Sequence, residues 1–429
     1  MTRLCKLICL GMLALVAIPL HAQCDDCQRL SVDELFKLGQ QTYSAKGYRI
    51  LEMSVEEQLK SAKSRFLPDL QVEAEAGYWG QPVYTGGPHW QQNYGIQMSQ
   101  PIYHGGGIKQ NINLASIKQE VARLQSVANE ADLRLELLGY YCNLLNLWEQ
   151  KKVREKNIEK SQLRYNDVRN MYEKGVVTRN DVLRSSLQLS EDSLGYRNVI
   201  NDISILSFRL ATILGLDDRR PVLPDTTLAG YLKEMDTLLP MDSYIELAYG
   251  KQPEMLIARQ RIKHAETELK LIRASNFPSI DFVAGYALSR PQARTFQNRY
   301  YNNWNIGLCL SYTFSALYKN KHNQLGKKQD ILYYQNEESK KAQELAININ
   351  NCYVKHKEAR DNIRILQHSV VQARENYRIL WNRYRNQLSI LTDLLDANNV
   401  MLEAELQLTI ARVDCIYTYY RLMHACGNL

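Results

Sequence analysis

Long apolar runs are missing after the first 22 residues, and no later stretch offers the ~20 consecutive apolar residues that a membrane-spanning helix needs. The eight histidines are dispersed, and the HExxH, GxSxG and Walker patterns of metalloproteases, hydrolases and nucleotide-binding enzymes do not occur. The glycine-rich stretch at 105–111 lacks the GK[ST] ending of a phosphate-binding loop and is better explained as a bend. We therefore expect no enzymatic activity, no cofactor and no metal site.

A strong charge imbalance is also absent. The formal net charge is +7, and the lysines and arginines are spread along the sequence rather than gathered in one block. No nucleic-acid partner is therefore expected. Phenylalanine is scarce, with 7 residues against 27 tyrosines. Tyrosine suits positions where one end of the ring is apolar and the other is hydrated, so its excess favours such boundaries.

The N-terminus has the pattern of a secretory signal. Arg3 and Lys6 precede an apolar run, and Leu20-His21-Ala22 is a plausible cleavage site, so we predict a signal peptide over residues 1–22. Cys24 offers an alternative as a lipidated N-terminus, although Gln23 before it is a poor match to the small residue that such a site requires.

The remaining cysteines are few and predict structure rather than chemistry. Without lipidation, Cys24 is expected to form a local disulfide with Cys27, because the predicted compartment is oxidising. A metal pair is disfavoured, since no second pair or nearby histidine completes a site. Small core positions are predicted for the other five, which are Cys142, Cys309, Cys352, Cys415 and Cys426.

The sequence repeats itself at a shift of 212 residues. Tyr172, Asp181 and Leu183 fall on Tyr384, Asp393 and Leu395 without a gap. The same shift aligns Gly95 with Gly307, Ser99 with Ser311, Lys109 with Lys321, Asn111 with Asn323 and Tyr141 with Tyr353. An unbroken register over a stretch on the order of 100 residues predicts two copies of one structural unit.

Each copy is predicted to run helix, strand, strand, long helix, turn, helix. The first copy spans 23–215, with an opening helix from about Val32 to Phe66, strands at about 70–79 and 93–103, a long helix at about 107–174, a turn at 175–180 and a return helix to 215. A linker follows at 216–240. The second copy spans 241–429, with strands at about 279–289 and 302–314, a long helix at about 317–386, a turn at 387–392 and a return helix to 426.

Both long helices carry the heptad spacing of a coiled coil. The apolar positions alternate in steps of four and three, at 117, 121, 124, 128, 131, 135, 138, 142 and 145 in the first copy and at 359, 363, 366, 370, 373, 377, 380 and 384 in the second. No proline occurs from Ile108 to Lys174. A helix of that length would be roughly 100 Å long, too long to pack inside a globular core.

The predicted strands alternate between apolar and small or polar residues. In the last strand, Trp304, Ile306 and Leu308 take one face, and Asn305 and Gly307 take the other. Membrane β-strands show this pattern, and a half-buried soluble sheet has the same period. Four strands cannot close a barrel, lipid permits no open sheet edge, and bacterial barrels begin at about eight strands. The sequence therefore predicts that two or three chains share one barrel.

The order, spacing and duplication of these elements resemble the TolC-like family of outer-membrane efflux proteins over essentially the whole mature chain. The residues that carry the resemblance are the FLPDL and FPSI strand entrances, the SQPIYHGGG stretch from Ser99, and the two Tyr…Asp-x-Leu turns. The resemblance implies a mainly α fold with membrane β: a homotrimer with a 12-stranded barrel in the outer membrane of a Gram-negative bacterium, continued into the periplasm by a helical coiled-coil barrel.

The function implied by this family is an export duct. It would contact outer-membrane lipid, dock with a periplasmic adaptor and an inner-membrane transporter, and expel small molecules, ions or secreted proteins. Two alternatives are a pore-less periplasmic coiled-coil scaffold and a stand-alone porin. The long helices would be useless to a simple porin, and a heat-modifiable trimer extracted in detergent would separate the duct and the porin from the scaffold.

The resemblance also assigns roles to residues at the turns. Aspartates at matching positions form the family's periplasmic constriction, which implies that role for Asp393, Asp396 and Asp181. Asp181 has the alternative role of a helix cap. The turn and the adaptor-docking surface would use Tyr172, Gly175, Leu183, Tyr384 and Leu395. Gln387 replaces the family's usual glycine and Ser389 a gating arginine, so the latch of the closed state could instead use Arg179, Arg383 or Arg385.

Overall fold

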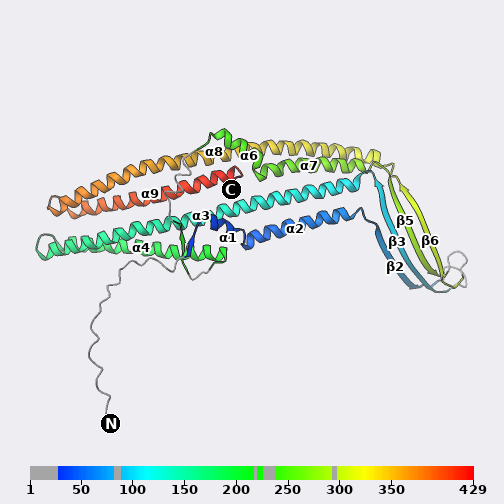
Figure 1. Cartoon of the computed structure of the whole chain (residues 1–429), viewed down its shortest axis with the longest axis horizontal. Helices are drawn as coiled ribbons and strands as arrows, with labels where there is room; N and C mark the ends of the chain where they lie inside the picture. The colour runs from blue at the N-terminus through cyan, green and yellow to red at the C-terminus, as the bar shows by residue number, and fades with distance from the viewer. Residues whose placement is uncertain (1–27, 82–87, 217–219, 226–237, 292–296) are drawn as a thin grey trace, which may run out of the picture.

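The computed structural model describes residues 28–81, 88–216, 220–225, 238–291 and 297–429. The predicted signal peptide and the Cys24–Cys27 pair lie outside these residues. The described chain is elongated, with two long helical hairpins side by side and one small sheet at the far end (Figure 1). The sheet bends away from the helices where it joins them. Among the described residues, no helix combines the length and apolar character needed to cross a bilayer.

The first half of the chain contains α1 (Val32–Gly39), α2 (Tyr43–Ser64), β2 (Asp69–Tyr78), β3 (Trp90–His104), α3 (Gly107–Glu173) and α4 (Arg179–Leu214). The second half contains α6 (Met241–Lys251), α7 (Pro253–Ala274), β5 (Ser279–Arg290), β6 (Tyr301–Ser311), α8 (Ala316–Arg385) and α9 (Leu391–Ala425). Two short strands, β1 (Gln28–Leu30) and β4 (Val222–Pro224), pair in parallel.

The single opening helix predicted from Val32 to Phe66 is wrong, because α1 and α2 are separate helices. Gly39 ends α1, and a side chain there would collide with Leu137 of α3. Thr42 is buried and caps α2 by accepting a hydrogen bond from the Ala45 amide at 3.3 Å. The second half has the same break, where Pro253 begins α7.

The four long strands form one antiparallel sheet in the order β2-β3-β5-β6. Residues directly opposite one another share a face in an antiparallel pair. Val72 lies opposite Ile96, Ile96 opposite Tyr286, and Tyr286 opposite Trp304. The apolar residues of all four strands therefore lie on one face, as the alternation predicted. In the described chain, β2 and β6 each have one unpaired edge.

The polar face of the sheet carries Gln71, Gln97, Gly285 and Asn305 in one row. Cys309 lies on this face and is exposed, so its predicted place in a core is wrong, whereas Cys142, Cys352, Cys415 and Cys426 are buried as predicted.

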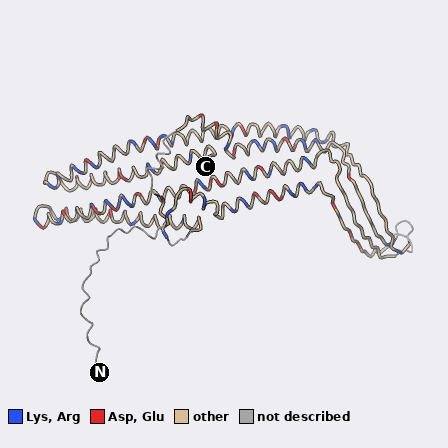
Figure 2. Tube along the Cα trace, viewed as in Figure 1, with Lys and Arg blue, Asp and Glu red and all other residues tan. Residues whose placement is uncertain are grey.

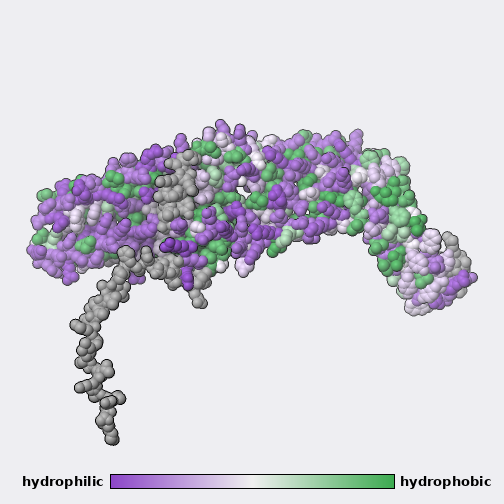
Figure 3. Space-filling model, viewed as in Figure 1, coloured by the Kyte–Doolittle hydropathy of each residue, from purple (hydrophilic) through white to green (hydrophobic). Residues whose placement is uncertain are grey.

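Charged residues are spread along the helices and are rare on the strands (Figure 2). Hydrophobic residues gather on the surface of the sheet next to the helices, whereas the helical part is mainly hydrophilic (Figure 3).

The helices pack as two antiparallel hairpins, α3 with α4 and α8 with α9, while α2 lies along the part of α3 nearer the sheet and α7 lies between α3 and α8 (Figure 1). None of the predicted heptad positions is exposed, and Leu138 and Cys142 are among the most buried side chains. The other faces are mixed, since Leu137 and Leu144 of α3 are also buried while Leu163 is exposed. The coiled-coil pattern therefore gives the correct buried stripe on both long helices.

The largest core lies at the middle of the molecule, where α1, α3, α4 and α9 meet the β1–β4 pair. Two aromatic side chains of α3 bind the strands there. The Tyr141 hydroxyl donates a hydrogen bond to the Leu30 carbonyl at 3.2 Å, and the Trp148 indole donates one to the Val222 carbonyl at 3.1 Å. These bonds satisfy buried backbone groups at the edge of a very short ladder.

Candidate functional site

The two turns at the free end of the helical hairpins have the same backbone geometry. In the first, the Gly175 amide donates to the Tyr172 carbonyl and the Val176 amide to the Met171 carbonyl. In the second, the Gln387 amide donates to the Tyr384 carbonyl, and the Leu388 amide donates to the Arg383 carbonyl. Each of the four residues in the second turn lies 212 positions after its counterpart in the first turn, which is the shift found in the sequence.

The residue at the bend differs between the two turns. Gly175 has a φ of 74°, in the left-handed region that glycine adopts without strain. Gln387 occupies the same position with a φ of 62°, and it is the one non-glycine residue with a positive φ in the described chain. The departure from glycine noted in the sequence therefore places a strained residue at the second turn.

Asp181 closes a capping box at the start of α4. Its backbone amide donates to the Thr178 hydroxyl at 3.3 Å, and its carboxylate accepts from the Thr178 amide at 2.9 Å and from the Thr178 hydroxyl at 2.7 Å. Both hydrogen bonds to the carboxylate end on its Oδ2 atom and complete a capping box at the start of α4. The geometry confirms the capping role that the sequence left open for Asp181.

Asp393 has no such bonds, because the N-cap residue of α9 is Ile390, which stands where Thr178 stands in the first copy. Isoleucine offers no hydroxyl to accept from the Asp393 amide or to donate to its carboxylate. Asp396 lies one turn further on, on the same exposed face of α9. Within the part of the chain that the structure describes, neither carboxylate has a hydrogen bond or an ion pair. Two free carboxylates thus stand side by side at the tip.

A small apolar cluster supports the tip from within. It consists of Val168, Tyr384, Leu391, Leu394 and Leu395, with Met171, Val177, Val182, Tyr377, Leu380 and Trp381 packed around it. Tyr384 is 6% exposed and Leu395 is 9% exposed, so both hold the turn together and are not presented to a partner. Burial raises the pKa of the Tyr384 hydroxyl to about 12, and the nearby Asp181 and Asp167 carboxylates act in the same direction.

The other two predicted docking side chains are accessible. Tyr172 is 43% exposed and Leu183 is 59% exposed. Both belong to the first hairpin, at the end of α3 and in the first turns of α4. Of the predicted docking residues, the structure therefore exposes those of the first copy and buries those of the second.

The predicted latch arginines behave differently from one another. Arg383 donates a hydrogen bond to the Leu388 carbonyl at 3.3 Å and so braces the second turn. Arg179 and Arg385 are exposed and bond no other group among the described residues. Ser389, where the family can have an arginine, donates to the Leu380 carbonyl at 3.5 Å.

The residue that links the two hairpins at the tip was not predicted. The Arg184 guanidinium of α4 donates to the Thr392 hydroxyl of α9 at 2.6 Å. Further from the tip, the Asn398 amide donates to the Asn157 side-chain oxygen at 3.2 Å. The sequence signal for Arg184 was weak, since an exposed arginine early in a helix is common.

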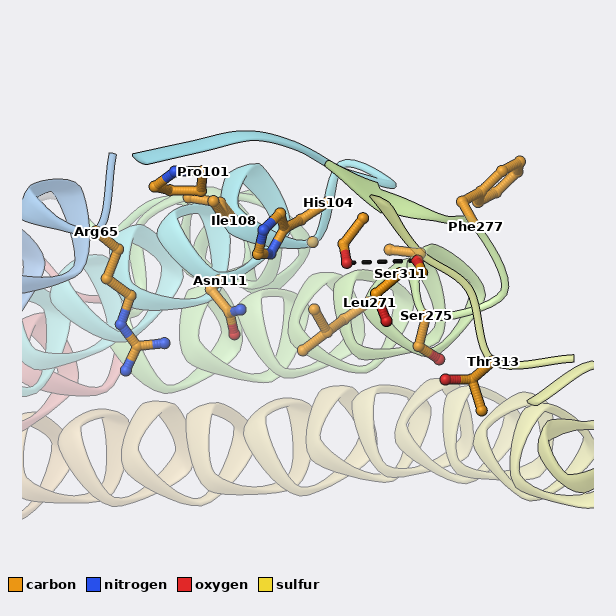
Figure 4. Close-up of a pocket in the computed structure, with 13 residues that line it drawn as sticks. Arg65, Pro101, His104, Ile108, Asn111, Leu271, Ser275, Phe277, Ser311 and Thr313 are labelled. Atoms are coloured by element: carbon orange, nitrogen blue, oxygen red, sulfur yellow. Dashed lines mark hydrogen bonds between the residues drawn. The ribbon is translucent and has the colours of Figure 1, made fainter. Parts of the chain in front are cut away.

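A second concave region lies at the opposite end, where strands and helices join. This cavity of about 520 Å³ is lined by residues of α2, β3, α3, α7 and β5 and by the residues that end β6, and Figure 4 shows His104, Asn111 and Ser311 around it while Phe277 points away. His104 contacts the Asp281 carboxylate at 2.7 Å. Gly105 and Gly106 have positive φ values and form the bend predicted for the glycine-rich stretch. No group of three or more potential metal ligands occurs among the described residues.

Comparison with known proteins gives one family and one fold. The chain matches the model of the outer membrane efflux protein family over residues 49–216 and 244–428. Its structure is similar to VceC from Vibrio cholerae, with a TM-score of 0.76, 15% identity, and coverage of 92% of this chain and 96% of that one. It is also similar to CusC, with a TM-score of 0.79, 14% identity, and coverage of 93% and 92%.

The open state of the Neisseria gonorrhoeae MtrE outer membrane channel is a further similar structure. Its TM-score is 0.72 at 17% identity, with coverage of 92% of this chain and 88% of that one. No curated protein matches the chain. At these identities the structural likeness shows a shared fold.

Proposed function

From the premise that this chain belongs to the outer membrane efflux protein family, we propose that three copies form an export duct through the outer membrane and into the periplasm. Each copy would contribute two structural repeats. The duct would work with a periplasmic adaptor and an inner-membrane transporter to expel small molecules, ions or secreted proteins. The match to a family of efflux proteins supports a transport role for this chain rather than an enzymatic one.

The observation that carries this proposal is the sheet. Its apolar face is exposed, with Leu308 at 69% and Val72 at 75%, and the edges of β2 and β6 are open. Lipid tolerates apolar side chains but no unpaired strand edge. Pairing β6 of one copy with β2 of the next would satisfy both edges. Three copies would give a barrel of twelve strands, with the polar face inside.

The helical tip supports the proposal of a cation-selective gate. Three copies would bring six carboxylates, from Asp393 and Asp396, around one mouth. Rings of acidic residues favour cations in a narrow channel. The missing cap at Ile390 supports this assignment, because it leaves Asp393 free of any structural duty that the described residues show. Asp181 would add negative charge to the same region while serving as a cap.

We further propose that the closed state is held by Arg184 bound to Thr392 within each chain, and that Arg179 and Arg385 extend the latch to neighbouring chains. Arg383 would act through the turn that it braces. The adaptor would dock on the exposed side of the tip that includes Tyr172, Gly175 and Leu183. Tyr384 and Leu395 would keep that surface in shape from inside.

The gate assignment is tested by the double substitution Asp393→Ala with Asp396→Ala. We expect single-channel recordings in a salt gradient to show a loss of most cation selectivity, with the assembled protein equally abundant. Asp181→Ala is the matched control: it should lower the free energy of unfolding by about 1 kcal/mol through its lost cap and change selectivity much less. Unchanged reversal potentials in the double variant would overturn the gate and leave the fold in place.

A further inference from the structure

A basic cleft lies between the two helical hairpins, well away from the turns. Its volume is about 420 Å³, and its walls come from α3 between Glu149 and Lys160, from α8 between Val370 and Tyr377, and from α9 between Met401 and Arg412. The α9 helix contacts both α3 and α8, and its residues complete the wall of the cleft. The cleft belongs to a single chain, so it exists before any assembly.

Positive charge exceeds negative charge in this cleft. Five of its residues are lysine or arginine and two are glutamate. Both glutamates are already paired. Glu149 binds Lys152 at 2.6 Å, and Glu405 binds Arg374 at 2.6 Å.

Three cationic side chains are left over, which are Lys156, Lys160 and Arg412. None of them has a carboxylate partner in the part of the chain that the structure describes. Arg412 as a residue is half-buried, and its guanidinium has no carboxylate acceptor among the described residues. Lys160 lies over the Tyr377 ring, with its ammonium 6.0 Å from the ring centre. An anion in the cleft would therefore find donors that no group of the protein occupies.

Apart from the polar side chains of Asn157 and Thr409 and the Tyr377 ring, the uncharged part of the lining is apolar. Val153 and Leu402 are half-buried, and Val370 and Met401 are 4% and 3% exposed. Small-molecule sites combine apolar surface with convergent polar groups, and the cleft offers both within a volume in the range of such sites. Inorganic anions would gain nothing from this lining.

The cleft is also short. The stretch of α3 along it covers 149–160, which at 1.5 Å per residue is roughly 16 Å. The hydrogen bond from Asn398 to Asn157 joins α9 to α3 near the Lys160 end of this stretch. A bounded space of this length suits a compact molecule better than a partner helix, which would need a continuous groove.

We propose that this cleft binds an amphipathic organic anion, a molecule with a carboxylate, sulfate or phosphate head and a short hydrocarbon body. The head would bind Arg412, Lys156 and Lys160, because charge-assisted hydrogen bonds to oxyanions are the strongest these side chains form. The hydrocarbon would cover Val370, Met401 and Leu402. The proposal uses none of the gate residues and stands apart from the export function.

The test uses the full-length assembled protein in nanodiscs of uncharged lipid, with hexyl phosphate as the probe and empty nanodiscs as the blank. Calorimetric titration should show saturable binding. Arg412→Gln and Lys156→Gln should each weaken it at least tenfold, while Lys63→Gln, at an exposed lysine of α2 far from the cleft, should leave it unchanged. Inorganic phosphate and hexanol should each bind at least tenfold more weakly than hexyl phosphate.

Three outcomes would overturn the proposal. Wild-type protein that shows no saturable binding would exclude the site. Wild-type affinity in Arg412→Gln, with the melting temperature also unchanged, would place the anion elsewhere. A helical peptide with glutamates four residues apart that binds the cleft, and that hexyl phosphate cannot displace, would assign the surface to a protein partner instead.

Discussion

At the scale of single residues, the two tip turns are a matched pair with one mismatch. Gly175 and Gln387 adopt nearly the same left-handed backbone conformation, with φ values of 74° and 62°. The hydrogen bonds that close the turn onto the preceding helix set its geometry, so the residue at the bend must adopt a positive φ. Glutamine does so at the cost of contact between its Cβ and the backbone.

Gln387→Gly should therefore stabilise the second turn. We expect a gain of up to about 1 kcal/mol, because relief of the left-handed strain exceeds the added entropy of glycine in the unfolded chain. Hydrogen exchange of the amides in the second turn should slow accordingly. Gly175→Ala is the mirror control: a Cβ there meets no other atom, so strain alone should destabilise the first turn by a similar amount. Equal exchange in Gln387→Gly and wild type would contradict this account.

A buried histidine makes the fold sensitive to acid. His356 of α8 is fully buried, its Nδ1 lies 3.1 Å from the Thr418 hydroxyl, and its Nε2 contacts no partner within the described chain. Burial, aided by Arg360, lowers the pKa of His356 from 6.5 to about 4. An unfolded chain would take up a proton near pH 6.5 that the folded chain refuses until near pH 4.

The free energy of unfolding should therefore fall as pH drops from about 6.5 to about 4, by about 3 kcal/mol from this residue. In His356→Leu that part of the pH dependence should disappear. Melting temperatures measured at pH 7.5 and pH 5 would show it as a smaller difference in the variant. His368→Asn, at an exposed position of α8, should keep the wild-type difference. A variant with the full wild-type slope would mean that other groups set the acid sensitivity.

At the scale of helices, one buried layer between α3 and α4 is polar, C-terminal to the predicted heptad positions of α3. Arg164 of α3 is 1% exposed and donates to the Ser161 hydroxyl at 2.6 Å. Ser161 in turn donates to the Asp192 carboxylate of α4, which also accepts from the Gln188 amide at 3.3 Å. The buried positive charge of Arg164 and the buried negative charge of Asp192 are thus linked through the Ser161 hydroxyl. Two nitrogens of Arg164 contact no acceptor in the described chain.

Removing one charge of this layer should cost far more than removing both. Asp192→Leu leaves a buried guanidinium uncompensated, and we expect a loss of roughly 3 kcal/mol. Adding Arg164→Met should recover most of that loss, because apolar side chains of similar volume can replace a buried ionic network. Denaturant unfolding of the two single variants and the double variant measures the coupling. Additive effects would show that the two charges do not interact.

The elements follow from local patterns, and their exceptions follow from contacts that local patterns do not contain. Heptads and alternation are visible in any short window, which is why α3, α8 and the four long strands were predictable within a few residues. The break between α1 and α2 lies at Gly39, which packs against Leu137 of α3, a contact almost a hundred residues away in sequence. Pro253, by contrast, was a readable signal for the start of α7.

The candidate site shows the same division. The 212-residue repeat was sufficient to find Asp181, Asp393 and the turn positions. It also contained a signal that was missed, since Thr178 aligns with Ile390 and only the first can complete a capping box. The bond from Arg184 to Thr392 was beyond sequence reasoning, because nothing local specifies which helices lie together at the tip.

At the scale of the whole molecule, the four-stranded sheet of one chain leaves an outer edge of β2 and of β6 unpaired in the described residues. Its exposed apolar face and its two open edges would make a lone chain prone to aggregation in water. Both features have a use if the apolar face meets lipid. The phase of the strands then decides which substitutions the membrane tolerates.

Leu308→Asp should block membrane assembly, whereas Asn305→Asp should be tolerated. Leu308 lies opposite Phe282 on the apolar face, and Asn305 lies opposite Gly285 on the polar face. A carboxylate facing lipid costs on the order of 1–2 kcal/mol in each chain, and a trimer would carry it three times. The readout is the amount of heat-modifiable trimer extracted from outer membranes. Equal yields of both variants would show that the apolar face does not contact lipid.

The parallel pairing of β1 with β4 has a consequence for how the chain is made. It joins residues 28–30 to residues 222–224 and closes the first half of the molecule into a loop. A chain that emerges N-terminus first already holds both strands of this loop and the α1, α3 and α4 part of the core while almost half of its length is still to come, and α9 adds Val413 and Ile416 to that core last. The second half then packs against elements that are already synthesised. The α7 helix packs against α3, and β5 pairs with the free edge of β3.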